Sequence, residues 1–164
     1  YDPAHKVLRL SDSVYSSTSL AAIGVAAHET GHAVQHSVGY APLGLRSAMV
    51  PLTNISSRLA MPLIFLGVIF GSSRGSDFGY MFIQGGIILF AMAVLFSVVT
   101  LPVEFNASAR AVKMLGNYGI LSTDELKPVK QVLSAAALTY VAAALSAIMS
   151  LLRLILIFGR RDDR

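Results

Sequence analysis

Residues 26–36 read AAHETGHAVQH and contain the pattern His-Glu-x-x-His, from His28 to His32. Residues four apart on a helix face the same way, so the imidazoles of His28 and His32 can be directed at one point and can chelate Zn²⁺ there. Glu29 is too close to them along the chain to share the ion comfortably, but it can hydrogen-bond a water molecule on the ion. Such a water is a hydrolytic nucleophile at neutral pH. The alternative is a helix whose core histidines are satisfied in other ways, but burying these groups costs several kcal/mol without a partner.

The helix around the motif is expected to begin after Ser16, Ser17 or Thr18, which can cap it, and to end at Gly39 as its C′ glycine. Its many alanines and glycines suit close packing against other helices better than contact with lipid. We therefore interpret it as a buried helix and not as a membrane span.

The composition of the 164-residue chain indicates a membrane protein. Hydrophobic residues make up 54% and charged residues 13%, whereas a soluble domain carries about 25% charged residues. The net charge of +4 could suggest nucleic acid, but the basic residues are scattered and flank apolar runs, where they act as topology determinants. The chain has no cysteine, so any metal must be held by His, Asp or Glu.

Three apolar segments are predicted to cross the membrane, namely residues 47–71, 80–103 and 132–158. The first contains Pro51 and Pro62, which are expected to bend it. The polar stretch GSSRGSDFG joins the first two segments into a hairpin, and GRRDDR forms a charged stop at the end of the chain.

Between the second and third segments, a helix is predicted from Glu104 to a closing glycine at Gly116, and residues 122–125 are predicted to cap a further helix. Before the motif helix, residues 6–10 form a short β-like run bounded by turn residues. The chain starts at Tyr1, so we expect an N-terminal segment to be missing, and this segment could contain another membrane anchor. The fold class expected is a mainly α, integral membrane helical protein with a zincin-like HExxH helix, about three transmembrane segments and a short N-terminal strand region. It is treated as one domain, made of residues 1–46 (strand and motif helix), 47–103 (transmembrane hairpin), 104–131 (helix of the ligand glutamate, and linker), 132–158 (last span) and 159–164 (charged tail).

A catalytic zinc needs a third protein ligand and an open position. The pattern HExxHxxGxxH is excluded, because Gln35 stands at the position of its glycine and Val38 at that of its third histidine. His36 lies one further turn along the stripe, too far to bind the ion together with His28 and His32, so a role beside the ligands or a plain structural role is expected.

Glu104 is the preferred third ligand. The chain has three glutamates. Glu29 is already assigned, and Glu125 is explained by its place in a helix cap. An ionisable residue directly after a span is a functional hypothesis by default, although an interfacial carboxylate paired with Arg110 is the alternative. The hairpin would enter the membrane near residue 46 and leave it near residue 103. Glu104 would therefore lie on the same side of the membrane as His28 and His32.

The order of HETGH, two spans and EFNASARA resembles the gluzincin layout of integral-membrane zinc proteases, among them the HtpX-type and the CAAX prenyl proteases. Over nearly the whole chain, the sequence resembles the bacterial putative neutral zinc metallopeptidase family of the YugP type. The stretches that carry this resemblance are YDPAHKVLRLSDSVY, SLAAIGVAAHETGHAVQHSVGYAPLGLRS, LPVEFNASARA and ALTYVAAALSAIMSLLRLILIFGRRD.

The resemblance implies that His28, His32 and Glu104 bind zinc and that Glu29 is the general base. The HtpX-like pattern has an aspartate four residues after the ligand glutamate, and Ser108 stands there in this chain. Asn106, Ser108 or a backbone carbonyl would then have to orient the imidazole. In related gluzincins, the strand before the motif helix pairs with the extended backbone of the substrate, which implies the same role for residues 6–10 of this chain. The alternative is that residues 6–10 only cover the site.

The sequence favours a membrane-embedded zinc endopeptidase, with a protein or peptide substrate and the lipid bilayer as partners and without nucleic acid. Arg110, Tyr118 and His36 are candidates to help stabilise the oxyanion. A catalytically inactive zinc-binding scaffold is the alternative, and a zinc transporter is disfavoured because the spans contain no acidic residue or histidine before Glu104. With three crossings, the side of the membrane that holds the site would carry most of the basic residues, namely Lys6, Arg9, Arg46, Arg110, Lys113, Lys127 and Lys130. The other side would carry Arg74 and the terminal arginines. This bias favours a site on the cytoplasmic side of the bacterial inner membrane.

Overall fold

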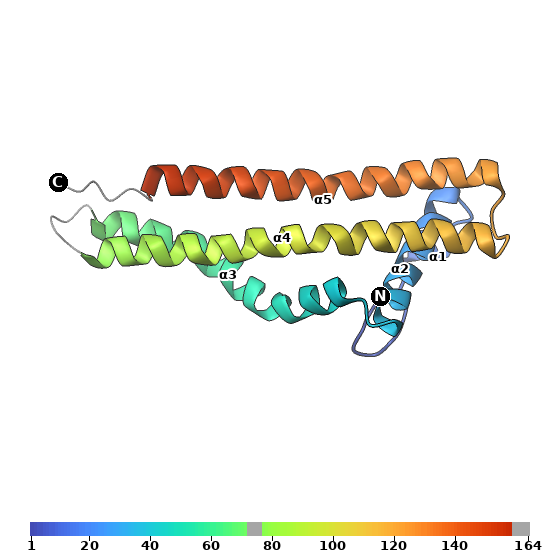
Figure 1. The fold of residues 1–164 in the computed structure, drawn as a ribbon, viewed down its shortest axis with the longest axis horizontal. Helices are drawn as coiled ribbons and strands as arrows, with labels where there is room; N and C mark the ends of the chain where they lie inside the picture. The colour runs from blue at the N-terminus through green and yellow to red at the C-terminus, as the bar shows by residue number, and fades with distance from the viewer. Residues whose placement is uncertain (72–76, 159–164) are drawn as a thin grey trace. The chain divides into compact units, whose positions relative to one another are not determined.

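The structure is a computed structural model that describes residues 1–71 and 77–158, and within these ranges the chain is mainly helical (Figure 1). Most of the predicted loop after Gly71, and the predicted charged tail at residues 159–164, lie outside the described residues. The described helices are α1 (Asp12–Tyr15), α2 (Leu20–Ser37), α3 (Ala41–Gly71), α4 (Asp77–Asn117) and α5 (Thr123–Phe158).

Three of these helices, α3, α4 and α5, are long and apolar enough to cross a membrane. The mainly helical fold with three candidate spans is therefore confirmed. Two predicted boundaries differ from the structure, because α3 begins earlier than residue 47 and α4 continues through Glu104 without a break, whereas α5 begins at its predicted cap. The boundaries had been drawn where polarity changes, but a change of polarity does not interrupt the hydrogen bonds of a helix backbone.

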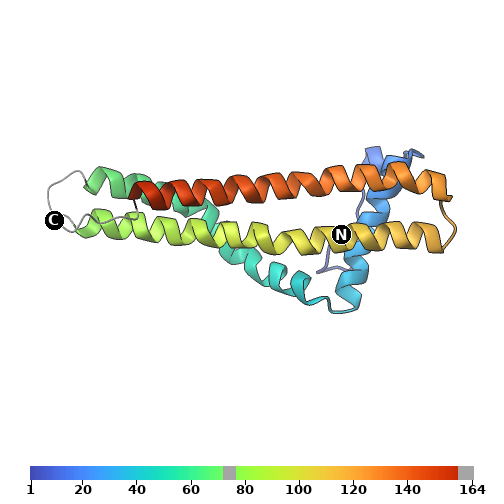
Figure 2. The same ribbon diagram turned by 45° about the horizontal axis from the view of Figure 1, so that its top comes forward.

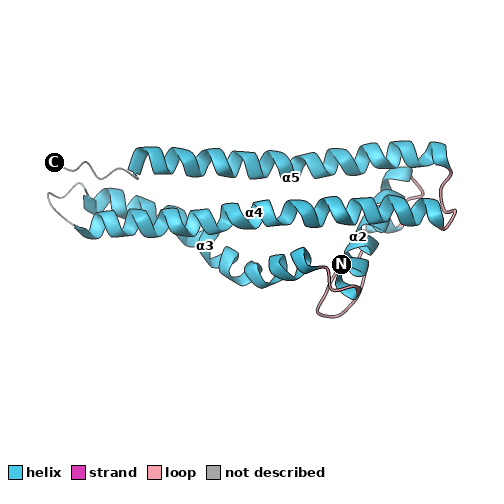
Figure 3. Ribbon diagram, viewed as in Figure 1, coloured by secondary structure: helices cyan, strands magenta, loops and turns pink. Residues whose placement is uncertain are grey.

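The predicted strand at residues 6–10 is wrong. In the described residues no strand is present (Figure 3), and the segment makes only an isolated antiparallel bridge between Asp2 and Val7. The turn between these residues places Lys6 at φ 55°, in the left-handed region. An alternating apolar run forms a ladder only when another strand lies along it, and here the chain folds back on itself too tightly to supply one.

The Asp2 side chain holds this turn together. Its Oδ1 accepts hydrogen bonds from the backbone N–H groups of Ala4 and His5, at 3.0 and 3.2 Å. Its Oδ2 lies 2.8 Å from His5 Nδ1. The side-chain hydrogen bond to His5, followed by the backbone hydrogen bond from the same residue, holds the pKa of Asp2 below its usual value.

The chain divides into two compact units. The first contains Tyr1–Leu45 and Thr100–Val141, and the second contains Arg46–Val99 together with the described residues from Ala142 on. We call them the site unit and the hairpin unit, and each is described by itself.

In the site unit, α2 and the included parts of α4 and α5 enclose an apolar core. Ser19 caps α2, in place of the three residues expected, by accepting a hydrogen bond from the Ala22 amide at 3.2 Å. Gly39 follows the end of α2 at φ 63°, as predicted for a C′ glycine. Ser122 and Glu125 form the predicted cap of α5 through reciprocal hydrogen bonds. The core itself consists of Ala111, Leu115, Leu121, Val129 and Leu133.

In the hairpin unit, α3 packs against the first part of α4 (Figure 2) through glycines. A Cβ atom on Gly86 would lie 2.8 Å from the Ala60 carbonyl oxygen, and a Cβ atom on Gly79 would lie 2.5 Å from the Gly71 backbone. Small residues at such positions let two helix backbones approach closely. Pro51 lies within α3.

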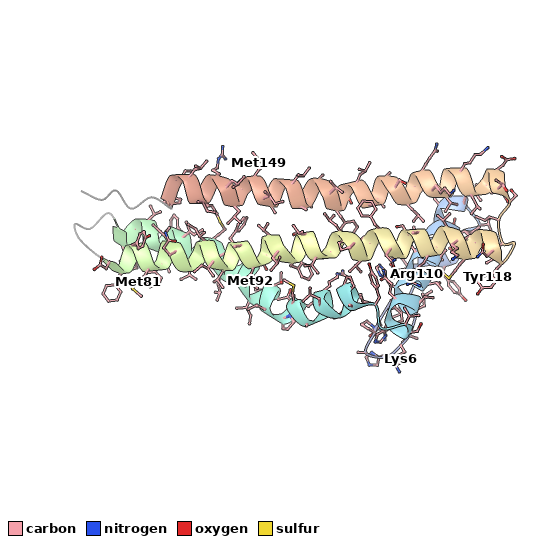
Figure 4. The ribbon with its side chains drawn as sticks, in the orientation of Figure 1. Lys6, Met81, Met92, Arg110, Tyr118 and Met149 are labelled. Carbon is pink, nitrogen blue, oxygen red and sulfur yellow. The ribbon has the colours of Figure 1, made fainter. Side chains whose placement is uncertain are left out.

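The outer faces of the hairpin unit are apolar. Met81 on α4 and Met149 on α5 are about two-thirds exposed, and they point away from the neighbouring helices (Figure 4). Exposed apolar side chains of this kind are what the hydrocarbon of a bilayer accommodates.

Pro62 also lies inside α3, whose ribbon changes direction along its length (Figure 1).

Candidate metal centre

α2 presents His28 and His32 one helical turn apart, with their Nε2 atoms 3.1 Å from each other. The two rings meet edge to face, with centroids 4.7 Å apart. α4 supplies Glu104, whose Oε2 lies 3.2 Å from His28 Nε2 and 3.6 Å from His32 Nε2. The structure thus brings together the three residues chosen from the sequence as ligands, although the glutamate lies 72 positions after the second histidine.

The donor set fits a zinc ion. Two imidazole nitrogens and one carboxylate oxygen lie within 4.8 Å of one another, and their closest separations are 3.1, 3.2 and 3.6 Å. Donors at zinc-ligand distance around a tetrahedral ion are about 3.3–3.6 Å apart. Three protein ligands would leave the fourth position of a tetrahedral zinc open, as catalytic zinc sites require.

Gly31 explains why α2 and α4 approach closely enough for the three donors to meet. It lies between the two histidines in sequence, and a Cβ atom there would be 2.5 Å from the carbonyl oxygen of Ala107. Both residues are buried, Ala107 completely. The second variable position of the motif is therefore filled by the one residue type that this contact between helix backbones admits.

The two glutamates of the site have different surroundings. The side chain of Glu104 is 4% exposed and is directed at both histidines. The side chain of Glu29 is 30% exposed, stands outside the cluster of three donors, and accepts a hydrogen bond from the backbone nitrogen of Tyr1. One carboxylate is thus enclosed with the imidazoles, and the other is accessible from outside.

Ser108 lies behind His28, with its Oγ 3.0 Å from His28 Nδ1. This residue takes the place of the aspartate expected from the HtpX-like pattern, and its hydroxyl can hold the ring from behind. Asn106, named as another candidate for this task, lies between two other side chains. Its Oδ1 accepts hydrogen bonds from Arg110 Nε at 2.8 Å and from Gln35 Nε2 at 3.0 Å.

Two further candidates lie away from the three donors. His36 is exposed, and its Nδ1 is 2.8 Å from the hydroxyl of Tyr1. Tyr118 is 77% exposed and points outward just beyond the end of α4 (Figure 4).

Sequence reasoning missed Gln35. This side chain is completely buried, and its Nε2 donates to the Val103 carbonyl oxygen at 2.8 Å as well as to Asn106. Its Oε1 lies 3.0 Å from His32 Nδ1. In the sequence, Gln35 served only to exclude another ligand pattern, whereas its place three residues after His32, on the same helix face, could have identified it as a neighbour of that ring.

Comparisons with known proteins find a family and a relative that match nearly the whole chain. The family described as "Putative neutral zinc metallopeptidase" matches residues 1–159 of the chain. The "Putative membrane protease YugP" of Bacillus subtilis (strain 168) is 49% identical over 165 residues, which cover 99% of this chain and 70% of that protein. No solved structure matches the chain significantly.

Proposed function

The chain belongs to the putative neutral zinc metallopeptidase family, and from this premise we propose that it is a membrane-embedded, zinc-dependent endopeptidase of the gluzincin type. The observation that carries the proposal is the convergence of His28, His32 and Glu104 from two distant segments. The name of the Bacillus relative, which includes the words membrane protease, supports the same activity. The three candidate spans support a location in a membrane.

In this proposal His28, His32 and Glu104 hold the zinc. A bound zinc ion polarises a peptide carbonyl and lowers the pKa of a coordinated water to about 7. Glu29 acts as general base: its carboxylate accepts a proton from the attacking water and then delivers this proton to the leaving amine. Its partial exposure supports this task, because a proton shuttle must reach the substrate, whereas the enclosed Glu104 suits a ligand.

We further propose a protein or peptide substrate, no nucleic acid partner, and an active site on the cytoplasmic side of a bacterial inner membrane. The support for sidedness is the distribution of basic residues over the segments that three crossings would separate. Because the chain has no cysteine, a Tyr118→Cys variant would carry a single thiol. We expect a membrane-impermeant maleimide to label it only after the membranes of spheroplasts are opened. Labelling in closed spheroplasts would reverse the proposed orientation.

The experiment that tests the function measures zinc per chain and cleavage of fluorescently labelled casein, using the full-length protein purified in detergent. We expect one zinc in the wild type and loss of zinc in Glu104→Ala. Glu29→Gln should keep its zinc but lose cleavage by about 10²–10⁴-fold, the usual contribution of a general acid–base.

Each alternative has its own result. A folded wild type without zinc would return the histidines to a packing role, and zinc retained at full affinity by Glu104→Ala would mean a different third ligand. Full cleavage by Glu29→Gln would exclude it as the base. Zinc without cleavage of casein or of the cell's own membrane proteins would favour the inactive scaffold.

A further inference from the structure

We propose that Gln35 is a positioning residue of the metal centre. It determines which ring nitrogen of neutral His32 carries the hydrogen, so that Nε2 presents its lone pair toward His28 and Glu104. The inference rests on the zinc centre proposed above. It concerns a residue that has no contact with solvent, since Gln35 is completely buried.

The orientation of the Gln35 amide follows from two independent partners. Its Nε2 lies 2.8 Å from the carbonyl oxygen of Val103, which can only accept a hydrogen bond. It also lies 3.0 Å from Asn106 Oδ1. The Asn106 assignment is fixed in turn by Arg110, whose Nε lies 2.8 Å away and can only donate. In the flipped orientation, the amide oxygen of Gln35 would face two other acceptors, the Val103 carbonyl oxygen and Asn106 Oδ1.

The proton on His32 follows from that orientation. With its nitrogen directed at Val103, the amide of Gln35 turns Oε1 toward His32 Nδ1 at 3.0 Å. An amide oxygen is only an acceptor, so Nδ1 must carry a hydrogen. A neutral imidazole has one N–H, and its other nitrogen, Nε2, then carries the lone pair that a metal requires. This is the nitrogen that faces His28 Nε2 at 3.1 Å.

The same side chain also ties α2 to the ligand turn of α4, because the carbonyl that accepts from Gln35 belongs to Val103, the residue before Glu104. Gln35 therefore contacts both halves of the donor set, one through a ring and the other through the backbone. Ser108 differs, because its hydroxyl can donate to His28 or accept from it and so does not select the protonated nitrogen.

Two variants separate the effect on the ring from a purely structural role. Gln35→Glu keeps an acceptor for His32 Nδ1 but loses the donor to Val103, whereas Gln35→Met keeps the length and removes both. We expect Gln35→Met to raise the zinc dissociation constant about 10–100-fold, the usual effect of losing such a partner, and Gln35→Glu to stay within about threefold of the wild type. Both variants should lower the Tm of the metal-free protein, because both remove the buried side-chain donor to the Val103 carbonyl oxygen. Gln131→Met, a change at an exposed glutamine of α5, should alter neither quantity.

The dissociation constants are measured by competition with a chelator in detergent, alongside the Tm of each metal-free variant. Equal zinc affinity in Gln35→Met and the wild type would overturn the inference. So would an equal loss in Gln35→Glu and Gln35→Met, because a purely structural role would give that result. A wild type that binds no zinc would instead refute the proposed function.

A second measurement does not depend on the variants folding. In zinc-loaded wild type with ¹⁵N-labelled histidine, long-range ¹H–¹⁵N correlations separate the four histidines and show which ring nitrogen carries a proton. We expect His32 to be protonated at Nδ1 and metal-bound at Nε2. Zinc on Nδ1 of His32, or an unprotonated Nδ1, would overturn the inference.

Discussion

Two glutamines, each inside a helix, show how the two units of the molecule differ. Gln35 in the site unit is completely buried and uses both ends of its amide, in contacts of 2.8 to 3.0 Å. Gln84 in the hairpin unit is only partly buried, and its Nε2 lies 3.5 Å from the Phe158 carbonyl oxygen, at the limit of a hydrogen bond. The site unit encloses polar groups and satisfies them, whereas the hairpin unit depends on apolar and backbone packing.

Glycines show the same division. Gly31 in the site unit and Gly86 in the hairpin unit both allow another helix to approach, since a Cβ atom on either would meet a backbone carbonyl oxygen at 2.5 or 2.8 Å. The contact at Gly31 lets the histidines and Glu104 meet, while the contact at Gly86 only packs α4 against α3. The same kind of contact therefore brings the candidate donor set together in one unit and serves helix packing in the other.

The largest effect is expected for Gly31→Ala. The new Cβ would collide with the Ala107 backbone, which cannot rotate away as a side chain could, so α2 must shift from α4. We expect a loss of about 1–3 kcal/mol in the free energy of unfolding. Zinc affinity should fall about 100-fold or more, because the ligand distances tolerate little displacement. Metal titration and thermal unfolding in detergent measure the two losses.

Gly24→Ala is the matched control on the same helix. Its Cβ would meet the Cγ1 atom of Val129 at 3.0 Å, the end of a side chain that can adjust, so both losses should be smaller. If Gly31→Ala kept wild-type zinc affinity, the close approach at Gly31 would be unrelated to the assembly of the donor set.

A smaller effect, confined to stability, is expected in the hairpin unit. Gly86→Ala would bring a Cβ atom within 2.5 Å of Ile64 and 2.8 Å of the Ala60 carbonyl oxygen, and should cost about 1–3 kcal/mol of unfolding free energy. A Cβ atom on the neighbouring Gly85 would have nothing within 4 Å, so Gly85→Ala should stabilise the helix by up to about 1 kcal/mol. Zinc affinity should stay within about threefold of the wild type in both variants. A loss of zinc affinity in Gly86→Ala as large as that in Gly31→Ala would end the distinction between the units.

The three candidate spans and the residues of the donor set could be predicted because each depends on a strong and local signal. Apolar length indicates a span, and the spacing of His28 and His32 indicates a shared helix face. Glu104 could be chosen because few carboxylates compete with it in this chain. The close approach that brings Glu104 to the histidines depends on Gly31 and Ala107, and no periodicity in the sequence pairs these two residues.

The remaining differences come from interactions that a single sequence does not display. The run at residues 6–10 alternates like a strand, but pairing depends on a partner strand, and the Asp2 turn removes that opportunity. Gln35 looked like a mismatch to another motif, since its importance lies in contacts with Val103 and Asn106 on α4. Local patterns thus predicted the candidate spans and the three residues of the candidate donor set, whereas the supporting contacts depend on the tertiary structure.

The smallest effect is expected for Gln84→Leu. The contact of 3.5 Å to Phe158 is too long to contribute much, and a carbonyl in the last turn of a helix has no partner within that helix, so other donors can readily reach it. We expect the free energy of unfolding to change by less than about 0.5 kcal/mol and zinc affinity to remain that of the wild type. Gln35→Leu, the same change in the site unit, should lose stability and zinc affinity together, because it removes the side-chain donor to the Val103 carbonyl oxygen and the acceptor for His32 Nδ1. Chemical denaturation and metal competition on the two variants side by side measure the contrast. If Gln84→Leu were as damaging as Gln35→Leu, polar contacts would matter equally in both units.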